Sequence, residues 1–317
     1  MFTYVPSGRS PRTTPIIHAV YHHPLLVTLS QSFHLSLYDI GVDSVTHTQT
    51  LSSFTSYPPS SLVLSTPSAT TYKLILAYAI PVYPAHWTVG ATELIISSTE
   101  ADRMMVTNTR TTRAIDIPPG WIDEGKMRAV REQWDRKVAR VADTQTDGKW
   151  VVLAPGQNLP LFDADAPSAA PHSSSSTSPS ASSSPTSSPA PPGTYVSSSM
   201  HSASGLQLYR LHLPASPSSS SLPRLTFVRT LHGQIGPVST LALSDGRCVS
   251  LGVNGSIWVW DLEAGTGTEV SAGACEAESW EGVRLRLASG TRGAVVFDDR
   301  RIVSACGAGV EVRRFDI

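Results

Sequence analysis

The 317-residue sequence predicts an all-β fold of small antiparallel sheets stacked on one another, with one helical insertion and one disordered Ser/Pro-rich insertion. Two observations predict the stacked sheets. Residues 231–261 contain three short apolar runs separated by turn signals, and weaker copies of this arrangement recur along the chain. A single meander of this size buries too little apolar surface to be stable, so it must pack against similar units.

The clearest unit is LHGQIGPVSTLALSDGRCVSLGVNGSIWVWD, residues 231–261. A Gly-Pro pair precedes its first apolar run, and Asp-Gly and Asn-Gly pairs, which favour tight hairpin turns, separate the next two. The expected strands begin at Val238 and cover residues 247–251 and 257–260.

This unit resembles a WD repeat. In that family a Gly-His pair opens the repeat, a Ser or Thr lies in the second strand, an Asp lies in the turn and Trp-Asp closes it. The corresponding residues here are Gly233, Gln234, Ser250, Asn254, Trp260 and Asp261. The resemblance implies a WD-repeat-like β-propeller in which these side chains form a hydrogen-bonded chain and Trp260 is buried. Gln234 and Asn254 replace the family's His and Asp, and since amides both donate and accept, we expect a weakened chain to persist.

Weaker copies of the unit lie at residues 23–40, 195–213 and 301–317, where apolar strands end in Tyr-Asp, Tyr-Arg and Phe-Asp pairs. Each could also be an ordinary hairpin of another β fold. In the middle of the chain, residues 72–80 and 150–153 are rich in β-forming residues, and residues 92–97 read as an antiparallel neighbour of 72–80 after a turn at Gly90.

Two insertions interrupt the repeats. Residues 163–223 are dominated by Ser, Pro and Ala, which offer little to bury, so we expect this segment to be mostly disordered. Residues 118–142 predict an amphipathic helix, because apolar side chains recur there every three or four positions. These side chains are Met127, Val130, Trp134, Val138 and Val141.

Without the insertions roughly 230 residues remain, which at about 40 to 45 residues per blade suffice for five or six blades. We therefore expect residues 1–317 to form a single degenerate propeller of five to seven blades. Either several blades are irregular or the ring is not complete within this chain, and a longer natural form is expected.

Charge, apolar runs, cysteine content and missing motifs make several classes of function less favoured. The net charge is −1, and no run of apolar residues is long enough to cross a membrane. Three cysteines without a CxxC pair favour a reducing compartment, the cytoplasm or nucleus. Motifs for nucleotide binding, serine hydrolysis and zinc proteases are missing from the sequence, which predicts no cofactor and no metal. Nucleic-acid binding through the basic helix is disfavoured, because Glu132 and Asp135 reduce its positive charge.

These features predict a non-catalytic protein-interaction scaffold that acts as a monomer. The sequence is also similar to the C-terminal part of fungal F-box/WD-repeat proteins, which implies a substrate receptor of a cullin-type ubiquitin ligase and ligase components as partners. No Leu-Pro-rich F-box precedes the first repeat, so within this family the sequence is expected to hold a substrate but not to dock the ligase adaptor. Candidate partner contacts are Trp87, Trp121 and Arg131. The alternative is a propeller hydrolase with a metal or a Ser/His/Asp site in its central channel.

Overall fold

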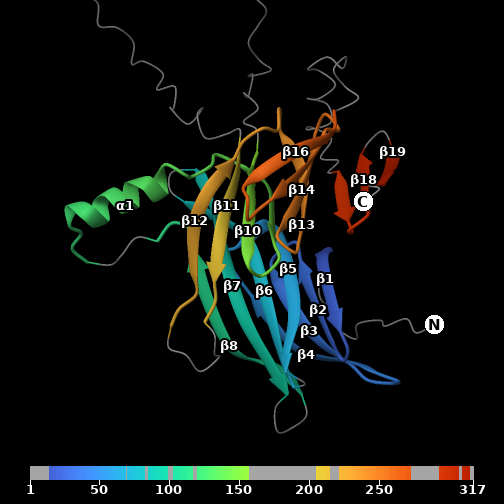
Figure 1. The fold of residues 1–317 in the computed structure, drawn as a ribbon. Helices are drawn as coiled ribbons and strands as arrows, with labels where there is room; N and C mark the ends of the chain where they lie inside the picture. Colours follow the sequence, from blue (N-terminus) through green and yellow to red (C-terminus); the bar gives the residue numbers. More distant parts are fainter. Residues whose placement is uncertain are drawn as a thin grey trace, which may run out of the picture.

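The computed structural model describes residues 14–68, 70–82, 85–98, 103–116, 120–156, 205–214, 221–272, 293–306 and 309–314. These residues form five antiparallel sheets and one α-helix, and each sheet uses consecutive strands of the chain (Figure 1). The fold is an all-β propeller of five blades, which agrees with the predicted class and lies at the low end of the predicted blade number.

The first three blades have four strands each. Blade one comprises β1 (Ile16–His22), β2 (Leu25–Ser30), β3 (His34–Ile40) and β4 (Val45–Ser52). Blade two comprises β5 (Tyr57–Ser68), β6 (Thr71–Val82), β7 (His86–Ser98) and β8 (Met104–Arg113). Blade three comprises β9 (Val141–Thr146), β10 (Trp150–Pro155), β11 (Leu206–His212) and β12 (Arg224–Leu231), and the helix α1 (Glu124–Trp134) lies between blades two and three in sequence.

The last two blades include the WD-like unit. Blade four comprises β13 (Val238–Ser244), β14 (Arg247–Gly252), β15 (Ile257–Asp261) and β16 (Thr266–Ser271). Blade five has three strands in the described residues, β17 (Ala294–Phe297), β18 (Arg301–Cys306) and β19 (Gly309–Arg314). The Asp-Gly and Asn-Gly pairs form the turns of blade four as predicted, because Gly246 and Gly255 adopt the positive φ that such turns need.

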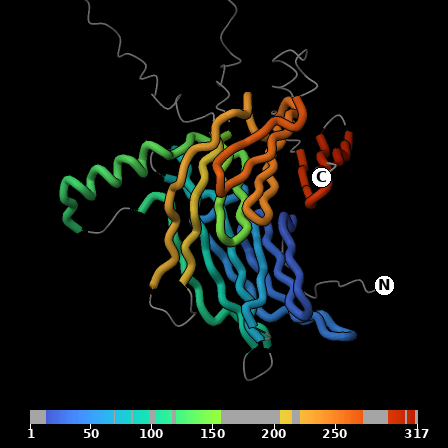
Figure 2. The backbone as a smooth tube through the Cα atoms, viewed as in Figure 1, coloured from blue at the N-terminus to red at the C-terminus, as the bar shows by residue number. Residues whose placement is uncertain are grey.

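The core is divided among the interfaces between consecutive blades, which follow one another from the blue first sheet to the red last sheet in Figure 2. Leucines of β2 and β3 pack on β6 and β7, and similar apolar clusters join blade two to three, three to four and four to five. Each fully buried aliphatic side chain contributes about 1.5–3 kcal/mol. Stacking therefore supplies the burial that no single sheet could provide.

Gly90 is not a turn residue, contrary to the prediction. It lies inside β7 opposite Tyr78, and the chain reverses before His86 instead. A Cβ atom at Gly90 would lie 2.3 Å from Cδ1 of Ile80, so the glycine makes room for a large neighbour on the adjacent strand.

The predicted helix 118–142 is too long, since α1 ends at Trp134. Val138 instead forms a β-bridge with Trp87, through backbone hydrogen bonds of 2.6 and 2.9 Å, and Val141 begins β9. Both valines are buried between blades two and three. Their three-residue spacing matched a helix, but their burial comes from the blade interface.

Several predicted features lie outside the described residues. These are most of the Ser/Pro-rich insertion, the start of the unit at 195–213 and the Phe-Asp pair at 315–316. The remainder of the 195–213 unit contains the whole of β11.

Candidate protein-interaction surface

The side chains predicted to stabilise blade four form a short hydrogen-bonded chain. Trp260 Nε1 donates to Ser250 Oγ at 2.8 Å, and Ser250 Oγ donates to Gln234 Oε1 at 2.6 Å. All three residues are buried. At Gly233, where φ is +146°, a Cβ atom would lie 2.7 Å from the ring of Trp258, which stacks on Trp260. The amide of Gln234 thus accepts a hydrogen bond where the family has His.

Asn254 and Asp261 serve turns beside this chain. Asn254 Oδ1 accepts hydrogen bonds from the N–H and Oγ of Ser256, at 3.1 and 2.8 Å. Asp261 Oδ1 accepts from the backbone N–H groups two and three residues later, both at 2.9 Å. Within the described part of the chain, Gln234 Nε2 is a buried donor with no partner.

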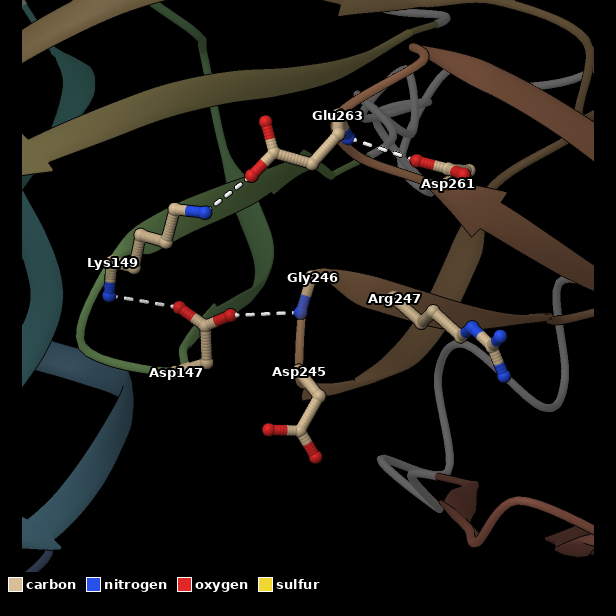
Figure 3. Close-up of a pocket in the computed structure, with 7 residues that line it drawn as sticks. All are labelled: Asp147, Lys149, Asp245, Gly246, Arg247, Asp261 and Glu263. Carbon is tan, nitrogen blue, oxygen red and sulfur yellow. Dashed lines mark hydrogen bonds and ion pairs between the residues drawn. The ribbon is translucent and has the colours of Figure 1, made fainter.

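A charged cavity of about 470 Å³ lies between the turns of blades three and four (Figure 3). Four acidic and two basic residues surround it, together with one glycine. They are Asp147, Lys149, Asp245, Gly246, Arg247, Asp261 and Glu263.

The charges of this cavity tie the two blades together. Lys149 of blade three forms an ion pair with Glu263, and Arg210 Nη1 lies 3.6 Å from the same carboxylate. Asp147 Oδ2 accepts the backbone N–H of Gly246 at 3.2 Å. The hydrogen bond from Lys149, with the charge of Arg210, lowers the pKa of Glu263. We therefore assign these residues to the join between blades.

A second set of hydrogen bonds joins blades three and four, and it was not predicted from the sequence. The buried carboxylate of Asp143, in β9, accepts hydrogen bonds from the N–H of Leu241 at 2.7 Å and from Thr240 Oγ1 at 3.1 Å. Its other oxygen accepts from the N–H of Thr144 at 2.8 Å. The one signal in the sequence is an acidic residue inside an otherwise uncharged strand.

The helix α1 stands apart from the blades and projects beside β12 (Figure 1). Asp123 caps its start by accepting the N–H of Lys126 at 2.8 Å, but none of the helix residues is buried. Two of the candidate partner contacts lie here: Trp121 is 100% exposed, and Arg131 is exposed on the helix. The third, Trp87, is half-buried and packs edge-on against Tyr57. The structure thus brings two candidates to one projecting segment and places the third in the blades.

A groove of about 730 Å³ runs between α1, the end of β8 and the residues that lead into β12. The helix lines it with Lys126, Ala129, Val130 and Gln133, whose spacing of three and four residues places them on one face. Leu222 is 76% exposed beside it. Arg131 lies outside this lining.

Two hydrogen bonds join the walls of the groove to one another. Gln133 Oε1 on the helix accepts the backbone N–H of Asp116 at 3.0 Å. Thr112 Oγ1 on β8 accepts the N–H of Leu225 on β12 at 3.3 Å. These bonds connect the three walls to one another, and a preformed surface lowers the cost of ordering on binding.

A second hollow, of about 360 Å³, lies between blades one and two and shares Thr111 and Arg113 with the groove. Its walls include apolar side chains of the blade interface and hydroxyls of β7 and β8. The apolar residues include Phe33, Leu35, Leu76, Tyr78 and Leu94. The end of β8 therefore separates a basic groove from an apolar hollow.

Among the described residues, no group of three His, Cys, Asp or Glu side chains is arranged to bind a metal ion. In the same part of the chain, none of the helical residues form a segment with the length and apolar character needed to span a membrane.

Comparison with known protein families gives a match to the F-box protein pof12 beta-propeller over residues 7–293. The chain belongs to this propeller family. A sequence comparison with curated proteins gave no match. Two solved structures are similar at 9% identity. The complex of KlAtg21 with the coiled coil of AgAtg16 has a TM-score of 0.42 and covers 96% of this chain and 68% of that one. Saccharomyces cerevisiae Sqt1 has a TM-score of 0.38, with coverage of 97% and 74%.

Proposed function

We propose that this propeller is a non-catalytic substrate receptor of a cullin-type ubiquitin ligase, which holds a partner protein at the surface formed by α1 and the end of β8. The observation that carries the proposal is the family match over residues 7–293, because the family is the propeller of an F-box protein.

The shape of the surface supports a protein partner. An exposed helix with an adjacent groove, and a fully exposed tryptophan three residues before the helix begins, offer the apolar and aromatic contacts that interfaces use. The charged cavity between blades three and four is less suitable, since several of its carboxylates already bind a lysine or backbone N–H groups.

The test compares the natural protein with a Trp121→Ala variant in affinity purification and in protein turnover. Because the F-box is the part that docks the ligase adaptor, the bait is the longer natural form expected from the sequence. This form should recover cullin and adaptor subunits together with a small set of other proteins. Those other proteins should be degraded more slowly in cells that lack the receptor. Trp121→Ala should retain the ligase subunits and lose the degraded proteins.

The matched control is Ile235→Ala, which removes an apolar side chain that is 82% exposed in the WD-like unit of blade four. A protein that is folded and still binds the same partners after this change would confirm that the α1 surface is the specific one. Recovery of partners whose half-lives do not depend on the receptor, without cullin or adaptor, would refute the ligase role.

A further inference from the structure

We infer that the groove beside α1 binds an extended acidic segment of the partner protein, and that an apolar side chain of this segment enters the hollow between blades one and two. The inference rests on the proposed protein-binding function and specifies the chemistry of its partner.

The charges at the groove favour an acidic ligand. Arg113, Lys126 and Arg224 line it, against the single carboxylate of Asp116. The three cations come from β8, α1 and β12, so positive charge surrounds the groove on each of its walls. Lys126 lies 3.9 Å from the exposed Asp123, a separation at which the pair is weak. The cations thus retain most of their capacity to attract carboxylates.

The apolar residues of the lining favour an acidic peptide over other anionic ligands. Val130 and the exposed Leu222 line the groove, and the adjacent hollow is lined by leucines and by Phe33, whose ring packs edge-on against Tyr78. A peptide can place a carboxylate and an apolar side chain on neighbouring residues, whereas a nucleic acid carries a phosphate at every position. The combination therefore favours an acidic peptide over RNA.

The groove and the hollow share lining residues, so one ligand can contact both. Arg113 and Thr111 line both the groove and the hollow, and successive side chains of an extended peptide point to opposite faces. A segment crossing the end of β8 can pair a carboxylate with Arg113 and direct a leucine into the hollow. A test peptide of about ten residues reaches roughly 33 Å when extended.

The experiment measures fluorescence anisotropy with a labelled synthetic peptide, about ten residues long when extended, in which glutamates flank a central leucine. The full chain should bind it saturably, and binding should weaken as salt rises. Arg113→Ala, Lys126→Ala and Arg224→Ala should each weaken binding about threefold to fivefold, as expected for exposed charges. Asp116→Asn should strengthen binding, because it removes the one opposing charge.

Matched controls separate the charges of the groove from general electrostatics. Arg247→Ala removes an exposed arginine from the cavity between blades three and four and should leave the affinity unchanged. A peptide with glutamine in place of glutamate, or serine in place of leucine, should bind at least tenfold more weakly. Thermal melts of the groove variants should match the parent, since the substituted residues are exposed.

Three results would overturn the inference. They are equal loss of affinity in Arg247→Ala, insensitivity to the leucine, and tighter binding of an RNA oligomer than of the peptide. If the peptide fails while cellular partners are still captured and degraded, the groove assignment is wrong and the receptor role stands. If the peptide binds as expected but no partner depends on the receptor for degradation, the ligase role is wrong and the groove assignment stands.

Discussion

Replacing Trp260 by Ala should destabilise the propeller strongly. Trp260 is 1% exposed, and its side chain packs among the residues between blades three and four. A buried aromatic side chain covers about 150–250 Å², which corresponds to roughly 4–6 kcal/mol before the part retained by alanine is subtracted. We expect a loss of about 3–5 kcal/mol, in line with other truncations of buried aromatic residues.

The surroundings argue for the upper part of this range. The Trp260 ring lies 2.2 Å from the Cβ position of Gly267, so Gly267 has no side chain that could move into the cavity. Ser250 would also lose the donor that now bonds its hydroxyl. Trp260→Phe should cost less, about 1–3 kcal/mol, because it keeps one six-membered aromatic ring and loses the rest of the indole together with its N–H donor.

Urea denaturation followed by far-UV circular dichroism and by fluorescence measures the loss, provided that the two transitions coincide. Trp121→Ala is the matched control: the same substitution at a fully exposed tryptophan should change stability by less than about 0.5 kcal/mol. A Trp260→Ala protein that unfolds within about 1 kcal/mol of the parent would refute the assignment of this residue to the blade core.

Three further predictions follow from buried or paired groups. Glu93→Ala should cost about 3–5 kcal/mol by denaturation, because it removes a buried carboxylate that pairs with Lys73 at 3.0 Å and lies 3.6 Å from Arg110. Burial raises the pKa of the Cys248 thiol, so iodoacetamide should label exposed Cys306 in the native protein and reach Cys248 only after unfolding; native labelling of Cys248 would contradict its position. The pKa of Glu263 is lowered in the folded state from 4.5, so its contribution to stability is present above that pH and is lost as pH falls below it. Glu263→Gln should therefore melt with a smaller drop between neutral and acidic pH at low salt than the parent, and an unchanged drop would count against the ion pair.

The strands of the WD-like unit were predictable from sequence because their ends are determined by turn chemistry. Asp-Gly and Asn-Gly pairs need positive φ, and they place β14 and β15 within one residue of the predicted ranges. The end of α1 was not predictable in this way, since Val138 and Val141 recur at helical spacing while packing between blades. Periodicity identifies which side chains are buried, but not which structure buries them.

The interaction surface was only partly predictable. Trp121 and Arg131 drew attention because they lie in a helical insertion, and the structure shows that this insertion projects from the blades. The groove itself combines Arg113, Lys126 and Arg224, which are far apart in the sequence and share no motif. Only the arrangement of blades two and three brings them together, so a search for motifs could not find them.

The residues that stabilise the propeller and those proposed to bind a partner form separate sets. Trp260 and Asp143 are buried at blade interfaces. By contrast, Arg113 is exposed on the outer strand β8 and Lys126 is exposed on the helix α1. Because strand pairing and blade packing stabilise the fold, substitutions that change the charge of the groove should cost little stability. Such a division suits a receptor, since the scaffold stays fixed while the exposed surface determines which protein is bound.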